Sequence, residues 1–397
     1  MRVNVFLNLE GNRQLAGSLV EKDGIVFQYF PSFIQSDLQL SPLALPLSRT
    51  PWKSTREIFG GLPGFIADSL PDGWGNLLLD RQLRKKGLRL HQISPLQRLC
   101  WVGDQGMGAL EYEPALSGVE VTFDSVQLDA FSENIQKILE EKESNEVLDA
   151  LSQMNGSSGG ARPKIVCLVS DDFQSIRQGT KAENGFKPWI IKFRHSEDSR
   201  YIGIYEYLSS IIARQAGLMV PRTHLFESDK GPGWFGIERF DRSTKGKIHM
   251  VTASGLLHCN FREPCLDYES LLALVVRMVG SSSLIEMFKR AVLNFSLGNI
   301  DDHAKNFSFL MNGSGVWSLS PVYDLVPSEN PMAEHMTSVL GVGRNPDRKL
   351  FLDLASKFDI TRKSAISAMD EVAAAVNMYT ELAKQYQVKV PNGVKEI

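Results

Sequence analysis

The chain contains 397 residues, of which 43% are apolar and 22% are charged, and its formal net charge is −3. This composition can bury a large core, which excludes a wholly disordered chain, and the length favours two or three domains. The small negative charge indicates neither a nucleic-acid-binding nor a membrane-binding surface. No apolar run reaches the roughly 18 residues of a membrane span, and the amino terminus lacks the apolar core of a signal peptide. We therefore expect a cytoplasmic protein.

Residues 1–120 combine strand and helix patterns. The segments 3–9 and 24–29 have the character of strands, and a turn rich in glycine and proline, GGLPGFIADSLPDGWGN, follows them. A leucine-rich helix comes next, and the segment WVGDQGMGALEYEP ends in a glycine turn and a strand. We predict an α+β unit over residues 1–120.

Residues 121–245 predict a second unit in which strands surround a glycine loop. We expect a helix over 127–154, strands over 164–169, 189–193 and 234–240, and a helix over 204–216. In the strand WIIKF, Ile190 and Lys192 share one face, because side chains alternate along a strand.

Residues 246–397 are dominated by helical patterns. The apolar residues of 284–295 recur at the spacing of a core-facing helix, and 363–386 predicts an amphipathic helix. The order of these segments is that of a two-lobed kinase: strands, a glycine loop, more strands and then helices. We therefore predict an α+β fold with two protein-kinase-like lobes, an additional amino-terminal α+β subdomain and a helical carboxy-terminal lobe.

The sharpest local motif is DDHAKN at residues 301–306. Protein kinases place a catalytic aspartate and a metal-binding asparagine five residues apart, the spacing of Asp301 and Asn306. A second metal ligand should follow on a later turn, where Asp324 stands in SPVYDL. The motif alone is weak, because Asp and Asn are common in loops. With His303 it also resembles the D-x-H-x-x-N motif of lipid kinases, so a kinase of lipids or small molecules remains an alternative.

Lys192 is the candidate ligand for nucleotide phosphates. A lysine on the inner face of an apolar strand needs a phosphate or a carboxylate as partner, and Glu206 on the next predicted helix could supply one. The alternative is a lysine that reaches solvent at a sheet edge. The loop at 156–161 can direct backbone N–H groups to phosphates, although by itself it could equally be a flexible linker.

The four cysteines show no paired CxxC spacing. His258, Cys259 and Cys265 could in principle hold a metal, but buried or inert thiols are the favoured interpretation. Such thiols fit a reducing compartment.

Several segments together resemble the HipA family of bacterial toxin–antitoxin kinases. The amino-terminal part contains SPLALPLSRTP, LPDGWGN and GDQGMGALEYEP. The rest contains SSGGARPK, WIIKF, GIERFDR, GNIDDHAKNFSFL and SPVYDL in the family's order. The resemblance implies that Asp301 is the catalytic base and that Asn306 and Asp324 bind Mg²⁺. The implied nucleotide-binding residues are Gly159, Gly160, Ala161, Arg162, Pro163, Lys164, Lys192, Glu238, Arg239, Phe240, His303, Ala304, Lys305, Asn306, Tyr323 and Asp324.

The same resemblance implies an ATP- and Mg²⁺-dependent serine/threonine kinase that autophosphorylates Ser157, with Ser158 adjacent. It further implies a protein substrate such as an aminoacyl-tRNA synthetase and a HipB-like antitoxin that binds DNA, so that DNA is met only through the antitoxin. Two departures, KIHMVTASGLLH after ERFDR and Arg162-Pro163 in the glycine loop, concern the choice of partner or substrate. A degenerate kinase that serves as a corepressor or scaffold remains the non-enzymatic alternative.

Overall fold

The computed structural model describes residues 1–397 except 55–57, 117–124, 156–158, 331 and 396–397. The amino-terminal part contains β1 (Arg2–Leu9), β2 (Asn12–Glu21), β3 (Ile25–Tyr29), β4 (Trp52–Lys53), β5 (Leu110–Glu113), α1 (Pro31–Ile34), α2 (Gly64–Ala67), α3 (Gly73–Lys85), η1 (Leu90–Gln92) and α4 (Pro95–Val102). Its strands form one antiparallel sheet in the order β4-β3-β2-β1-β5. Alternate residues of β1 are buried, as the sequence pattern predicts.

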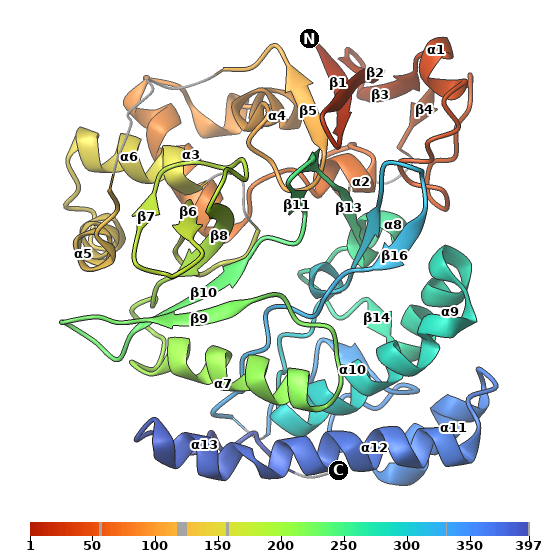
Figure 1. Cartoon of the computed structure of the whole chain (residues 1–397). Helices are drawn as coiled ribbons and strands as arrows, with labels where there is room; N and C mark the ends of the chain where they lie inside the picture. Colours follow the sequence, from red (N-terminus) through yellow and green to blue (C-terminus); the bar gives the residue numbers. More distant parts are fainter. Residues whose placement is uncertain (55–57, 117–124, 156–158, 331, 396–397) are drawn as a thin grey trace.

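A second antiparallel sheet lies beside the first and has the order β7-β6-β8-β10-β9 (Figure 1). Its elements are α5 (Leu128–Leu139), α6 (Asn145–Asn155), β6 (Lys164–Ser170), β7 (Ile176–Arg177), β8 (Phe186–Lys192), α7 (Ile202–Gln215), β9 (Thr223–Phe226) and β10 (Trp234–Glu238). The single helix predicted over 127–154 is wrong. Two helices form instead, because Glu141 adopts a left-handed backbone (φ 58°) that a continuous helix cannot contain.

The remaining elements are mostly helical, and those nearest the carboxy terminus lie along the bottom of Figure 1. They are β11 (Arg242–Ser243), β12 (Gly246–Lys247), β13 (His249–Thr252), α8 (Ala253–Leu257), β14 (Leu266–Asp267), α9 (Tyr268–Val279), η2 (Ser281–Ser283), α10 (Leu284–Leu297), η3 (Ala304–Asn306), β15 (Ser308–Met311), β16 (Trp317–Leu319), β17 (Thr337–Ser338), α11 (Arg348–Ser356), α12 (Arg362–Asn377) and α13 (Tyr379–Gln385). Helix α10 carries the predicted apolar stripe and packs against α9 and α12. The helix predicted over 363–386 is divided at Met378 into α12 and α13.

Two apolar clusters hold these parts together. The larger cluster joins the amino-terminal sheet to α7, α9, α10 and α12. The smaller one joins α5, α6 and the second sheet to α3, which contributes Trp74 and Leu78. Both clusters therefore include side chains from either side of residue 120, and the boundaries expected at 120 and 245 stay predictions.

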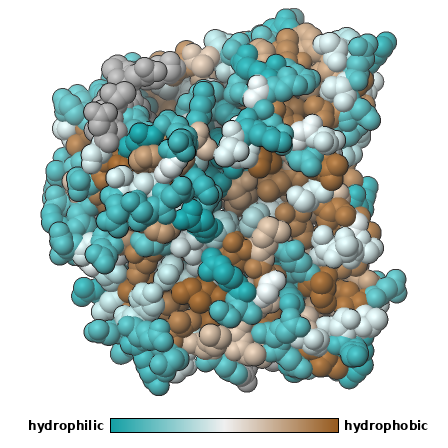
Figure 2. Space-filling model, in the orientation of Figure 1, coloured by the Kyte–Doolittle hydropathy of each residue, from teal (hydrophilic) through white to brown (hydrophobic). Residues whose placement is uncertain are grey.

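Two features bear on a membrane-facing surface: the length of the apolar helices and the distribution of hydropathy on the face drawn in Figure 2. No helix there is long and apolar enough to cross a membrane. On the face drawn in Figure 2, hydrophilic and hydrophobic residues are interspersed.

Candidate active site

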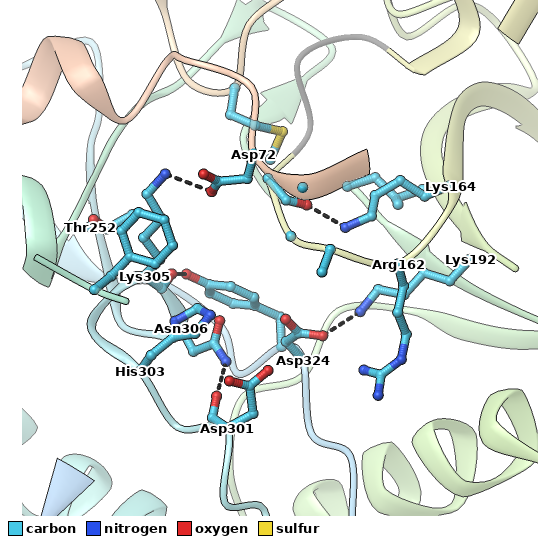
Figure 3. Close-up of a pocket in the computed structure, with 18 of the residues that line it drawn as sticks. Asp72, Arg162, Lys164, Lys192, Thr252, Asp301, His303, Lys305, Asn306 and Asp324 are labelled. Atoms are coloured by element: carbon cyan, nitrogen blue, oxygen red, sulfur yellow. Dashed lines mark hydrogen bonds and ion pairs between the residues drawn. The ribbon is translucent and has the colours of Figure 1, made fainter. Parts of the chain in front are cut away.

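A cavity of about 790 Å³ lies where the second sheet, the amino-terminal part and the loops after α10 meet. Figure 3 shows Arg162, Lys164 and Lys192 on one side of it and Thr252 and Lys305 on the other, with the carboxylates of Asp301 and Asp324 between them. The cavity thus combines several cationic side chains with an apolar wall that includes Ile190 and Ile237. Its acidic lining residues are Asp68, Asp72, Asp198, Glu238, Asp301 and Asp324.

Lys192 forms two ion pairs in the wall of the cavity. It belongs to β8, the middle strand of the second sheet, so the alternative of a lysine at a sheet edge is wrong. Its Nζ atom lies 2.5 Å from Glu206 Oε1 on α7 and 2.6 Å from Asp324 Oδ1. The pairing with Glu206 that the sequence predicts is therefore present. Asp324 adds a third member from a segment 132 residues away along the chain.

Burial and neighbouring charges raise the pKa values of Lys192 and Glu206 and lower that of Asp324. Burial alone would lower the pKa of Lys192, but the charges of Asp324 and Glu206 outweigh it and raise the pKa. Burial would likewise raise the pKa of Asp324, yet Lys192 and Lys164 hold it below its usual range. Burial does raise the pKa of Glu206. Asp324 is therefore the more firmly ionised of the two carboxylates.

The loop after α10 presents Asp301 to the cavity and buries Asp302. The carboxylate of Asp302 accepts hydrogen bonds from Tyr268 Oη at 3.0 Å and from the backbone N–H of Thr337 at 3.0 Å, and His335 Nδ1 lies 3.1 Å away. Because Asp302 is held inside the protein, Asp301 is the carboxylate available to a ligand. Burial raises the pKa of Asp301.

The remaining residues of DDHAKN divide between the cavity and the interior. Asn306 donates from Nδ2 to the backbone oxygen of Asp301 at 2.7 Å, which closes the loop on itself. His303 lines the cavity, and its buried Nδ1 has no hydrogen-bond partner among the described residues. Lys305 also lines the cavity, whereas Ala304 is buried and does not.

Asp324 has an unusual backbone conformation, and the preceding Tyr323 contacts the loop that carries Asp301. Asp324 has a left-handed conformation (φ 58°), which is uncommon for a residue other than glycine and recurs at functional sites. The Tyr323 hydroxyl donates to the backbone oxygen of Lys305 at 2.6 Å, and its ring lies 5.3 Å from that of Phe240. The tyrosine therefore connects the two loops that carry Asp301 and Asp324.

Residues 159–164 cover the upper side of the cavity. Lys164 is buried and donates from Nζ to the backbone oxygen of Gly159, and burial together with the charge of Lys192 lowers its pKa to about 8. Arg162 pairs with Asp198 at 3.1 Å. Pro163 does not line the cavity; its carbonyl oxygen instead accepts a hydrogen bond from the backbone N–H of Phe193. Ser157 and Ser158 lie outside the described residues.

The ERFDR segment contributes less through its side chains than the sequence suggests. Glu238, Arg239 and Phe240 all line the cavity. The guanidinium group of Arg239, however, points into the interior, where it pairs with the fully buried Asp241 at 2.8 Å. Arg239 therefore supports the segment, and the sequence alone offered no sign of this.

The sequence-based prediction missed the contribution of the amino-terminal part. Asp72, just before α3, pairs with Lys305 at 2.7 Å and lies 3.7 Å from Arg262. Asp68 accepts hydrogen bonds from the backbone N–H and the hydroxyl of Thr252, and burial raises its pKa to about 6. The signal available in the sequence is the pair of aspartates in the turn IADSLPDGWGN.

The oxygen atoms at the base of the cavity fit a magnesium ion. Asp324 is ionised, and Asn306 holds its amide nitrogen on Asp301, which leaves its amide oxygen unengaged by any described side chain. No group of three or more His, Cys, Asp or Glu side chains among the described residues is arranged to hold a metal. A magnesium ion here would therefore take its other ligands from phosphates and water, as it commonly does in nucleotide sites.

Two family models match the chain. Residues 156–379 match the HipA-like C-terminal domain, and residues 6–113 match the HipA N-terminal domain. The chain belongs to the HipA family. The first model covers more than half of the chain, and the two matches together contain every residue that lines the cavity.

Similar proteins include two curated bacterial relatives of this HipA-family chain. One, from Haemophilus influenzae and named "Putative kinase", is 26% identical over 204 residues, which are 47% of this chain and 57% of the relative. The other, "Putative kinase Y4dM" from Sinorhizobium fredii, is 24% identical over 226 residues, which are 51% of this chain and 54% of the relative. The matched region thus spans little more than half the length of these relatives.

A solved structure resembles nearly the whole chain. It is the complex of the toxin–antitoxin proteins HipA and HipB with operator DNA from Shewanella oneidensis MR-1, and it covers 96% of this chain and 90% of the matched chain. The TM-score is 0.69 and the sequence identity 18%. This likeness confirms the α+β, two-lobed kinase-like fold predicted from the sequence.

Proposed function

We propose that this HipA-family chain is a serine/threonine protein kinase that uses Mg²⁺-ATP and acts as the toxin of a HipBA-like toxin–antitoxin system. The observation that carries the proposal is the ion triad of Lys192, Glu206 and Asp324 at the edge of a large cavity. A lysine on a central strand, a glutamate on the following helix and an aspartate on a later turn recur in protein kinases. Asp301 and Asn306 supply the kinase spacing beside it.

Each of these residues has a definite task in the proposed reaction. Lys192 and Lys164 neutralise phosphate oxygens on one side of the cavity, while Asp324 and Asn306 hold the metal. Asp301 orients the acceptor hydroxyl and receives its proton. When bound, ATP would supply the phosphoryl group, and Mg²⁺ would neutralise the negative charge that develops on the phosphate oxygens. The apolar wall that includes Ile190 and Ile237 suits an adenine ring.

The proposed partners extend this kinase chemistry by analogy. The similar Shewanella structure contains HipB and operator DNA, which supports a HipB-like antitoxin as the partner of this chain. Contact with DNA would then occur through the antitoxin. A translation component such as an aminoacyl-tRNA synthetase is the proposed substrate, and Ser157 is the proposed site of autophosphorylation, with Ser158 next to it.

The proposal is tested by mass spectrometry of the purified chain after incubation with Mg²⁺-ATP. Trypsin should release Ser157 and Ser158 in the peptide 143–164, because the bond between Arg162 and Pro163 resists cleavage. We expect a phosphate on this peptide in the wild type. Asp301→Asn should slow its appearance by about 10²- to 10⁴-fold, the contribution of a general base.

A matched control is Asp353→Asn, which makes the same chemical change at an exposed position of α11. It should phosphorylate at the wild-type rate. Binding of Mg²⁺-ATP without phosphate on the peptide would favour the small-molecule kinase. If the peptide carries no phosphate and the chain binds no nucleotide, the corepressor or scaffold is the better account.

A further inference from the structure

Two of the four cysteines lie together beside the cavity, outside the residues used so far. The Sγ atoms of Cys259 and Cys265 are 2.8 Å apart and share a hydrogen bond. Cys259 is half-buried and Cys265 is exposed, whereas Cys100 and Cys167 are buried in the apolar clusters. Cys100 and Cys167 are therefore buried, as expected, whereas Cys265 reaches the surface.

The ends of the segment 259–265 are anchored by regular structure. The backbone N–H of Cys259 donates to Ser254 O at 3.1 Å, and the buried Ser254 hydroxyl donates to Cys259 O at 2.7 Å, which fixes this cysteine to the end of α8. Cys265 directly precedes β14, which pairs with β17. Cys259 and Cys265 thus lie at the two ends of the short loop 259–265, and the regular structure that anchors these ends keeps them close together.

The middle of this loop reaches into the candidate active site. The Phe261 ring lies 5.5 Å from the His303 ring and 4.3 Å from Lys305 Nζ. The guanidinium group of Arg262 approaches Asp72 at 3.7 Å. Both side chains line the cavity, and Arg262 is 63% exposed, which places it at the edge of the opening.

We propose that Cys259 and Cys265 form a reversible disulfide and that the loop 259–265 is a redox-responsive element of the cavity. A disulfide needs two β-carbons close enough for an S–S bond of about 2.05 Å. The two sulfur atoms are already in contact, so only a small adjustment is required. In a reducing compartment such a bond is transient and serves as a sensor.

The thiols differ in the way that this reaction requires. The hydrogen bond with Cys259 lowers the pKa of the Cys265 thiol, while the same contact and burial raise the pKa of Cys259. The exposed Cys265 therefore ionises first and meets oxidants from solvent. Cys259 is held in place to resolve the product.

With hydrogen peroxide as oxidant, the thiolate of Cys265 attacks one peroxide oxygen, the O–O bond breaks, and a sulfenic acid and hydroxide form. The sulfur of Cys259 then attacks the Cys265 sulfur, the S–S bond forms, and the sulfenic hydroxyl leaves as water with the proton of the Cys259 thiol. For hydrogen peroxide, two thiols lose two hydrogens and the peroxide becomes two molecules of water. A dithiol reductant reverses the reaction.

A disulfide between Cys259 and Cys265 restrains the loop that carries Phe261 and Arg262. A ligand that must order this loop loses less conformational freedom on binding when the disulfide has already ordered it. This consequence rests on the proposed nucleotide site, whereas the disulfide itself does not. We expect the oxidised chain to bind Mg²⁺-ATP about fivefold more tightly, or more, than the reduced chain.

The disulfide is tested on the full chain treated with hydrogen peroxide and digested without reduction. Trypsin cleaves after Arg262, between the two cysteines, so the bond should link the peptides 248–262 and 263–277. Cys100 and Cys167 in the same sample should remain free thiols. Cys265→Ser should yield no linked pair. Over-oxidised Cys265 without linkage, or linkage only between two chains, would overturn the proposal.

The coupling to the cavity is tested by two further measurements on the same samples. Hydrogen–deuterium exchange at residues 260–264 should slow on oxidation and recover with dithiol. Mg²⁺-ATP affinity should rise on oxidation in the wild type but not in Cys265→Ser. Equal affinity in both redox states would refute the coupling, while absence of Mg²⁺-ATP binding in both states would refute the proposed function instead.

Discussion

Lys192 shows how one side chain joins two lobes. Its ammonium group lies between Glu206 and Asp324, and only 13% of the lysine side chain and 4% of the Glu206 side chain are exposed. Removing the cation would leave the carboxylates of Glu206 and Asp324 without the ammonium group that lies between them. Such an uncompensated charge is costly, whereas replacing both members of a buried pair by apolar groups can be nearly neutral.

Lys192→Met should therefore lower the free energy of unfolding by about 3 kcal/mol and abolish binding of Mg²⁺-ATP. The double variant Lys192→Met with Glu206→Leu should recover part of the stability but none of the binding. Urea unfolding and calorimetric titration with Mg²⁺-ATP measure the two effects. A single variant as stable as the wild type would show that the triad does not hold the lobes together.

At the scale of elements, the turn after β10 fastens the second sheet to the amino-terminal part. Asp241 is fully buried, and it pairs with Arg239 at 2.8 Å and with Arg242 at 2.7 Å. It also accepts the backbone N–H of Gly108 at 2.7 Å. Burial would raise the pKa of Asp241, but the two arginines hold it well below its usual range.

Asp241→Ala should destabilise the protein by about 3–5 kcal/mol, because both arginines would remain buried without their carboxylate. Asp229→Ala, at an exposed position between β9 and β10, is the matched control and should change stability by less than about 0.5 kcal/mol. Chemical unfolding of both variants gives the comparison. Similar losses of stability in the two variants would show that the buried charge of Asp241 has no special role.

Strand β13 introduces a dependence of stability on pH. His249 is fully buried, its Nε2 lies 2.9 Å from Leu40 O, and burial lowers its pKa to about 4 from the ordinary 6.5. The unfolded chain therefore takes up a proton at higher pH than the folded chain does. The stability that the neutral imidazole contributes is complete above pH 6.5 and is lost as the pH falls towards 4.

We expect the wild type to lose about 3 kcal/mol through this histidine over that range. In His249→Gln, which keeps a side-chain donor for Leu40, this part of the pH dependence should be absent. The exposed His91→Gln should retain it. Unfolding free energies measured between pH 7 and pH 4 give the difference, and parallel curves for all three proteins would contradict the assignment.

At the scale of the whole molecule, the cavity is built by parts that are distant in the sequence. Lys305 and Asp72, which form an ion pair at 2.7 Å in its wall, are 233 residues apart along the chain. A ligand that fills the cavity therefore contacts all of these parts at once and should favour the folded state as a whole.

Mg²⁺-ATP at about 100 times its dissociation constant should raise the free energy of unfolding by about 2.7 kcal/mol. The magnesium-dependent part of this gain should disappear in Asp324→Asn, because that change removes an anionic metal ligand. Thermal unfolding with Mg²⁺ and with a chelator separates the two contributions. A wild-type chain that gains nothing at any nucleotide concentration would contradict the proposed site.

The sequence alone was sufficient for patterns that depend on local backbone geometry. Side chains alternate along any strand, so the inward face of Lys192 followed from WIIKF, and the apolar spacing of 284–295 specified α10 in the same way. The five-residue separation of Asp301 and Asn306 is likewise local. The nucleotide and metal roles assigned to these residues stay predictions.

Tertiary structure decided which of these local elements meet. The pairing of Asp72 with Lys305, the burial of Asp302 and Arg239, and the contact between Cys259 and Cys265 all depend on how helices and loops from separate regions pack. The breaks at Glu141 and Met378 also escaped the periodicity, because the apolar spacing on either side of each break is that of a helix. Periodicity records which face is buried, and only packing determines what that face is buried against.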